Sequence, residues 1–128
     1  MNVVDSSAWL EYFANGPNAD AFAPAIEATD ALVVPAICLY EVAKRILQQR
    51  GQAPALEATT LMRQGRVVDL DAQLAWSAAQ VAIAYRLAMA DAVILACAQR
   101  CGATLWTQDA HFEGLPGVEF RRAGGRKS

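Results

Sequence analysis

Short apolar segments alternate with helical patterns along this chain, and that alternation limits the fold more than any other feature. Residues 2–4, 31–35, 66–70 and 104–107 are predicted strands, with residues 118–120 as a last edge strand. Strands separated by helices form right-handed crossovers, which give a parallel sheet covered on both faces. The sequence therefore predicts an α/β fold, a three-layer α/β/α sandwich around a mostly parallel sheet of four to five strands.

The chain of 128 residues is long enough for one domain with a buried core and too short for two. We expect a single domain over residues 1–122 and a basic, disordered tail over residues 123–128. Gln80, Arg86 and Asp91 interrupt the longest apolar stretch, so no run reaches the roughly 18 residues that a membrane span needs. The N-terminus also lacks the basic segment of a secretory signal. We therefore expect a cytoplasmic protein without a membrane segment.

Helical spacing is clearest in ICLYEVAKRILQQRG, which predicts a helix that ends at Gly51. The face expected to be buried consists of Leu39, Val42, Ala43, Ile46 and Leu47. Asp71 is the predicted cap of a long Ala-rich helix through Tyr85. A short helix is expected around Pro24, which should lie near its start or bend it. Further helices are predicted after Ser6, after Pro54 and from near Ala90 to Gly102.

The three cysteines, an odd number, do not form a closed set of disulfides, and a domain of this size does not need one. Cys97 and Cys101 stand four residues apart, but a zinc site would also require Cys38 and His111, which lie at unpatterned distances. Small buried side chains are therefore the favoured interpretation of the cysteines.

The net charge of −2 is unevenly distributed along the chain. No Lys or Arg occurs before Lys44, whereas six acidic residues fall in that first third. The other end reverses the sign, and its basic residues are Arg121, Arg122, Arg126 and Lys127. Such a terminus is either solvated or binds an anionic partner, and the solvated interpretation is the more common one.

Asp91 is surrounded by uncharged residues from Leu87 to Cys97. A carboxylate removed from water costs several kcal/mol unless it is paired, protonated or bound to a metal ion. Asp91 could also be the N-cap of the helix that follows, but capping leaves its charge in place. The residue therefore needs a cation nearby or a route to solvent.

Three other acidic residues lie near predicted strand ends. Asp5 directly follows the first strand, Asp109 comes just after the fourth, and Glu41 belongs to the helix that leaves the second. Each also has an ordinary explanation. Asp5 can cap a helix, Asp109 can be a loop residue, and Glu41 can pair with Arg45 for about 0.3–0.5 kcal/mol.

Taken together, these four acids indicate more than their separate roles. The carboxyl ends of parallel strands meet at one edge of the sheet, where ligands collect. Clustered carboxylates repel each other unless a divalent cation neutralises them, and oxygen ligands suit Mg²⁺ or Mn²⁺. We therefore expect one metal site, whose ligands are Asp5, Glu41, Asp91 and Asp109.

At these residues the chain resembles the PIN-domain family, and within it the VapC-type ribonuclease toxins of toxin–antitoxin pairs. The resemblance covers nearly the whole chain in four blocks of the expected order. VVDSSAWLEYF carries the first acid and its hydroxyl neighbour, Ser6 or Ser7, and PAICLYEVAKRI carries Glu41. LAMADAVILACAQRCGATLWTQDAHFEGLPGVEF carries Asp91 and the Thr107-x-Asp109 pair.

Two features depart from the family. A pattern such as T-R-D-x-D-F is common after the fourth strand, whereas this chain has Gln108 and Ala110-His111 at the variable positions. That departure leaves the metal ligands intact and affects the expected substrate contacts of the loop. The acidic overall charge is also unusual, because nucleic-acid-binding proteins generally carry a basic surface.

The resemblance implies a metal-dependent endoribonuclease that uses Mg²⁺ or Mn²⁺. Asp5, Glu41, Asp91 and Asp109 would hold the metal, and the hydroxyl of Thr107, like that of Ser6, would orient carboxylates or substrate. Arg86 and the arginines of the tail are candidates for phosphate contacts.

The resemblance also implies three partners: an RNA substrate, a second copy of the chain in a homodimer, and a cognate antitoxin whose Arg-bearing tail occupies the acidic pocket. Tyr12 is a candidate for lining an antitoxin groove, whereas Trp9 and Phe13 are expected to belong to the core.

Two functions of other classes remain open from the sequence. One is a non-catalytic PIN-like module that binds metal and serves protein association. The other is a receiver-type phosphoacceptor domain, which also has Mg²⁺ at strand ends. The receiver pattern is the weaker of the two, because its acid pair and late lysine are missing here.

Overall fold

Five parallel strands form the centre of the computed structural model, which describes residues 1–124. They are β1 (Asn2–Val4), β2 (Leu32–Pro35), β3 (Arg66–Val68), β4 (Thr104–Thr107) and β5 (Val118–Phe120). The strand order is β3-β2-β1-β4-β5, and every neighbouring pair is parallel. The predicted α/β fold and all five predicted strands are confirmed.

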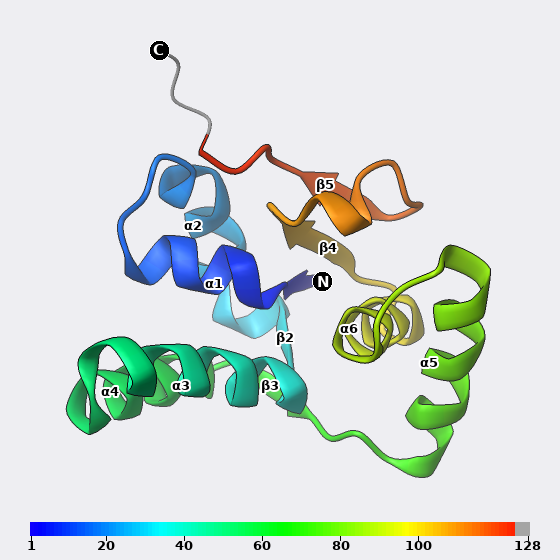
Figure 1. The fold of residues 1–128 in the computed structure, drawn as a ribbon, viewed down its shortest axis with the longest axis horizontal. Helices are drawn as coiled ribbons and strands as arrows, with labels where there is room; N and C mark the ends of the chain where they lie inside the picture. Colours follow the sequence, from blue (N-terminus) through cyan, green and yellow to red (C-terminus); the bar gives the residue numbers. More distant parts are fainter. Residues whose placement is uncertain (125–128) are drawn as a thin grey trace.

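Helices cover both faces of this sheet, as Figure 1 shows. One side carries α1 (Ser6–Phe13), α2 (Ala19–Glu27), α3 (Ala36–Arg50) and α4 (Gln52–Met62), and the other carries α5 (Ala72–Tyr85) and α6 (Met89–Arg100). Two short 3-10 helices, η1 (Thr29–Ala31) and η2 (Ala110–Phe112), complete the connections. The arrangement is the expected three-layer sandwich.

Local signals explain several helix ends. The Asp71 carboxylate accepts a hydrogen bond of 2.8 Å from the Leu74 N–H, which confirms the predicted cap of α5. Gly51 ends α3 with φ 91°, a conformation that costs glycine little. The prediction for α4 was wrong at its start, because α4 begins at Gln52 and includes Pro54 in its first turn. Proline is tolerated there because the first N–H groups of a helix have no intrahelical partner.

Two details of the predicted helices differ from the structure. Pro24 lies inside α2, at its sixth residue, so the first of its two predicted alternatives, a place near the helix start, is wrong. On α3 the buried side chains are Cys38, Val42 and Ile46, whereas Leu47 is 47% exposed. The buried face of α3 is therefore rotated about the helix axis, from the expected face toward Cys38. This face packs on the sheet, because α3 starts directly after β2.

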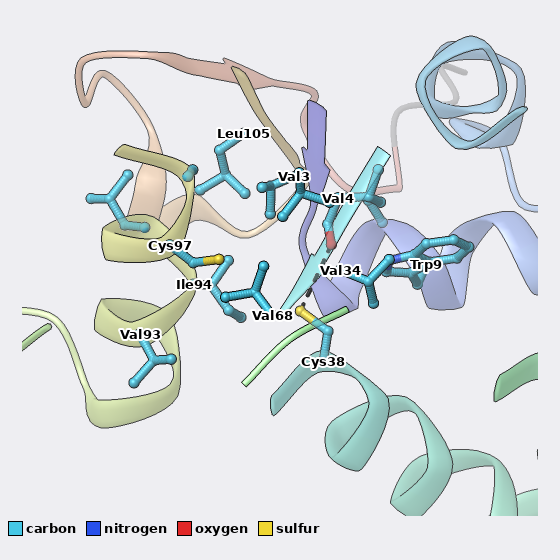
Figure 2. Close-up of a cluster of buried hydrophobic side chains, with 14 of the residues drawn as sticks. Val3, Val4, Trp9, Val34, Cys38, Val68, Val93, Ile94, Cys97 and Leu105 are labelled. Carbon is cyan, nitrogen blue, oxygen red and sulfur yellow. Dashed lines mark hydrogen bonds between the residues drawn. The ribbon is translucent and has the colours of Figure 1, made fainter. Parts of the chain in front are cut away.

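The core is divided by the sheet, and Figure 2 shows both halves. Val93, Ile94 and Cys97 of α6 pack against one side of the strands, while Trp9 and Cys38 lie on the other side. Cys38 and Cys97 are both fully buried, and the Cys38 thiol donates to the Val4 carbonyl at 3.8 Å. These two cysteines behave as small core residues.

Trp9 and Phe13 also meet the expectation for core residues. Trp9 is fully buried and stacks on Phe13 with ring centroids 5.7 Å apart, and Phe13 packs partly buried against the same cluster. Tyr12 is half-buried, and its hydroxyl donates to Glu27 at 3.3 Å.

Within residues 1–124, no individual helix combines the length and hydropathy needed to cross a bilayer. Helices α5 and α6 together meet that test by length and composition, with a bend of 111° between them. Of the predicted basic tail, Arg126 and Lys127 lie outside the described residues.

Candidate active site

The strand order brings together residues from opposite ends of the chain. The connections run from β1 outward to β3, and the chain then returns to place β4 beside β1. In parallel sheets, the point where the order reverses leaves a crevice at the carboxyl ends of the two central strands. Asp5 follows β1 at this point, and Thr107 and Asp109 stand at the end of β4.

Asp5 is buried, with 3% of its surface exposed. Its Oδ2 accepts hydrogen bonds from the Ser7 hydroxyl at 2.6 Å, the Thr107 hydroxyl at 2.9 Å and the Ser7 N–H at 3.3 Å. The last of these bonds confirms the capping interpretation for α1. Among residues 1–124, no hydrogen bond reaches the other carboxylate oxygen, Oδ1.

Burial raises the pKa of Asp5 to about 6, because removing a carboxylate from water disfavours its charged form. The hydroxyls of Ser7 and Thr107 act in the opposite direction, and the charge of Asp91 raises the pKa further. Within residues 1–124, no cationic side chain is among the main causes of this shift. A divalent cation at Oδ1 would supply the missing positive charge.

Thr107 joins two of the acids. Its fully buried hydroxyl donates to Asp5 and accepts from the Asp109 N–H at 2.9 Å. The Asp109 carboxylate in turn accepts from the His111 N–H at 2.9 Å and caps η2. This chain of bonds fixes the position of both carboxylates relative to the end of β4.

Asp91 is the third residue of α6, which begins at Met89 after Ala88 in the N-cap position. The N-cap interpretation of Asp91 was therefore wrong, because the helix starts two residues earlier. An acid in the first turn still interacts favourably with the positive helix terminus. Burial raises the pKa of Asp91, and the nearby charge of Asp109 adds to the shift.

Glu41 is half-buried on α3 and accepts a short hydrogen bond of 2.6 Å from the Ser6 hydroxyl. Within residues 1–124 it forms no ion pair with Arg45, so the alternative explanation of Glu41 as a member of a solvated pair does not hold. Ser6, the residue after Asp5, thus ties the start of α1 to α3.

All four predicted acids line one pocket of about 410 Å³. Its wall consists of Asp5, Ser6, Ser7, Leu10, Tyr40, Glu41, Lys44, Arg45, Gln48, Asp91 and Asp109. Thr107 is absent from the wall and acts on it only through Asp5 and Asp109. The cluster is therefore one site, with acids from β1, α3, α6 and the segment after β4.

His111 was not among the predicted ligands of this site. Its Nδ1 lies 3.3 Å from Asp91 Oδ2 and 3.3 Å from Asp109 Oδ1, and the ligand atoms of these three residues lie within 4.8 Å of one another. The carboxylate oxygens and one imidazole nitrogen match the donors that divalent cations use. Two sequence signals pointed to His111: it follows Asp109 by two residues in a short loop, and it stands where the T-R-D-x-D-F pattern has its second acid.

The basic residues near the acids also differ from the expectation. Arg86 is exposed at the end of α5 and does not line the pocket. Arg121 lies over the Trp106 ring at 5.9 Å and pairs with Glu119 at 3.6 Å. Among the described residues, the cations in the pocket wall are Lys44 and Arg45 of α3.

The sequence matches the model of the PIN domain over residues 3–118, which include all the acids of the pocket. The chain belongs to the PIN domain family. Membership excludes the receiver-type interpretation, because the matched region is nearly the whole chain. Among curated proteins, a sequence comparison with this PIN domain finds no match.

Solved structures share the fold of this PIN domain at low sequence identity. One is a toxin–antitoxin complex from Klebsiella pneumoniae, which is 21% identical. The match covers 93% of this chain and 96% of the chain in that structure, with a TM-score of 0.78. DNA-bound VapBC from Salmonella typhimurium is 18% identical, with coverages of 94% and 96% and a TM-score of 0.74. VapC20 from Mycobacterium tuberculosis, a toxin that cleaves the sarcin-ricin loop, is 19% identical, with coverages of 88% and 92% and a TM-score of 0.71.

Proposed function

We propose that this PIN domain is a divalent-metal-dependent endoribonuclease and acts as the toxin of a type II toxin–antitoxin pair in the cytoplasm. One observation carries the proposal. Asp5, Glu41, Asp91 and Asp109 come from four separate segments and line a single pocket. The similarity of the fold to toxin–antitoxin structures, one of them an RNA-cleaving toxin, supports the same function.

The residues of the pocket are suited to hold Mg²⁺ or Mn²⁺. A bound divalent ion would lower the pKa of water and stabilise the charge that develops on the phosphate during hydrolysis. Asp5, Glu41, Asp91 and Asp109 would bind the ion, and Asp5 has an oxygen without a hydrogen-bond donor among the described residues. Thr107 would hold Asp5 and Asp109 in place, and Ser6 would do the same for Glu41.

The wall of the pocket also offers groups that suit an RNA strand. Lys44 and Arg45 line it on the α3 side and can contact phosphate. Tyr40 is 61% exposed on the same wall, and an exposed aromatic ring provides a surface on which a base can stack. These three residues would hold the strand while the acids hold the metal.

The proposed partners follow from the same site and from the similar structures. An acidic pocket attracts a basic peptide, so an antitoxin with an Arg-bearing tail would inhibit by occupying it. VapBC and FitAB structures with the same fold are complexes bound to DNA. We also propose a homodimer, for which the uncharged outer face of α5 is the candidate contact.

The test of this function is cleavage of a structured RNA by the purified chain in the presence of Mg²⁺ or Mn²⁺. Cleavage should stop with a chelator and in Asp91→Asn, which keeps the size of the side chain and should keep the fold. Asp20→Asn, a matched change at an exposed acid of α2, should retain full activity. Circular dichroism of each variant should report the same helix content.

The result also separates the proposal from its main alternative. Full activity of Asp91→Asn would contradict the role of the pocket in catalysis. A chain that binds metal through Asp91 but cleaves none of a panel of structured and single-stranded RNAs would instead be a non-catalytic PIN-like module for protein association.

A further inference from the structure

His111 places an imidazole nitrogen beside Asp91 and Asp109, two of the acids that line the pocket. The side chain is 73% exposed, yet its Nδ1 is held between two carboxylates, at 3.3 Å from Asp91 and 3.3 Å from Asp109. The loop fixes this position, because the Asp109 carboxylate also accepts the His111 N–H at 2.9 Å. The Nδ1 atom of the imidazole therefore lies close to both carboxylates.

The spacing of these atoms is close to that of ligands around one ion. Adjacent ligands of an octahedral ion with bonds of about 2.1 Å are about 3 Å apart. The Nδ1–oxygen distances of 3.3 Å are slightly longer, as expected for groups that close onto an ion when it binds. Asp5 supplies an independent observation on the same pocket: its carboxylate is buried, and its Oδ1 has no hydrogen-bond donor among residues 1–124.

We propose that His111 binds the metal through Nδ1 and makes this site prefer Mn²⁺, and other first-row transition ions, over Mg²⁺. Mg²⁺ is a hard cation that selects oxygen ligands, whereas transition ions accept imidazole nitrogen readily. Replacing one oxygen ligand by an imidazole nitrogen therefore lowers the affinity for Mn²⁺ less than the affinity for Mg²⁺. The inference rests on the proposed metal site and adds the identity of the ion to it.

The chain offers a direct test because His111 is its only histidine. Pulsed electron paramagnetic resonance of the untagged chain loaded with Mn²⁺ should detect hyperfine coupling to a ring nitrogen. Labelling histidine with ¹⁵N should change that coupling, and His111→Ala should remove it. Loss of the coupling in His111→Ala with Mn²⁺ still bound would assign the nitrogen to this side chain.

Affinities of Mn²⁺ and Mg²⁺, measured by calorimetry on the same samples, give the second readout. We expect the wild-type chain to favour Mn²⁺, and His111→Ala to lower that preference by about tenfold or more. His111→Asp should raise the affinity for Mg²⁺, because it replaces the nitrogen by a carboxylate. Glu113→Ala, a change at an exposed residue of the same loop, should leave both affinities unchanged.

Two outcomes distinguish this inference from the proposed function. Mn²⁺ that binds in an Asp91-dependent manner without nitrogen coupling, and with an unchanged preference in His111→Ala, would overturn the role of His111 and leave the nuclease proposal intact. Absence of any metal binding that depends on Asp91 would overturn both.

Discussion

At the scale of single residues, Asp5 combines several structural roles in one buried side chain. It caps α1, receives hydrogen bonds from Ser7 and Thr107, and lines the acidic pocket while almost fully buried. A charged group in that position is unfavourable for folding unless a cation accompanies it. The buried charge of Asp5 therefore lowers the stability of the metal-free protein, and metal binding would offset that loss.

Asp5→Asn should therefore stabilise the metal-free chain at neutral pH while it removes metal binding. The folded pKa of Asp5, about 6, exceeds the usual value for an unfolded aspartate, so the folded state binds the proton more tightly. Wild-type stability should fall relative to Asp5→Asn as the pH rises from about 4 to about 6, by roughly 3 kcal/mol at most. Urea unfolding in chelator across this pH range measures the difference. A less stable Asp5→Asn at pH 7.5 would contradict the prediction.

Thr107 offers a second test at the same scale, because it is outside the pocket wall and touches the acids only by hydrogen bonds. Thr107→Val keeps the shape and removes the hydroxyl, so Asp5 and Asp109 lose their common partner. We expect RNA cleavage to fall by about 10- to 100-fold with the fold retained. Thr104→Val, on the same strand and away from the pocket, is the matched control; equal rates for the two variants would rule out the positioning role.

At the scale of elements, α3 contributes both kinds of charge to the pocket. Glu41 stands on the acidic side, and Lys44 and Arg45 follow within little more than one turn. A parallel sheet with α3 directly after β2 places the start of this helix beside the strand ends. The helix can therefore supply a metal ligand and phosphate contacts from one face.

Arg45→Ala should weaken RNA binding more than it slows the chemical step. Arg45 is exposed and makes no ion pair among residues 1–124, so its loss should leave stability nearly unchanged. We expect KM for RNA to rise several-fold, and the salt dependence of binding to drop by about one phosphate contact. Arg63→Ala, at an exposed cation after α4 and outside the pocket, should change neither quantity.

At the scale of the whole molecule, the outer face of α5 combines large exposed apolar side chains with the absence of charged ones. The helix carries no charged residue between Ala72 and Tyr85, and Trp76 and Ile83 are 72% and 83% exposed on it. These two side chains are seven residues apart and so lie on the same side of the helix. Large exposed apolar groups that share one face indicate an association surface.

We expect Ile83→Asp to convert a wild-type dimer to a monomer. A charge in the centre of an apolar contact must lose its hydration when the copies meet, which weakens association. Light scattering at several protein concentrations measures the mass. Leu56→Asp, an equal change at a side chain that is 70% exposed on α4, should leave the dimer intact. A dimer that survives Ile83→Asp would place the contact elsewhere.

Local sequence patterns were sufficient to predict the strands, most helices and the position of the acids after strand ends. Those features depend on local periodicity, turn residues and the rule that parallel strands share one carboxyl edge. Asp5, Glu41, Asp91 and Asp109 were identifiable for this reason, and they line one pocket. The predicted start of α6 near Ala90 agrees with the observed start at Met89, although its N-cap, Ala88, provides no side-chain signal.

The order of the strands and the contacts between polar atoms depend on how the whole chain folds. The order β3-β2-β1-β4-β5 puts Thr107 against Asp5 across 102 positions of sequence. The same packing brings His111 close to Asp91. It also places Lys44 and Arg45 of α3 in the pocket wall, where Arg86 was expected to contact phosphate. These contacts depend on how whole helices and strands pack against each other, and local sequence patterns do not determine that packing.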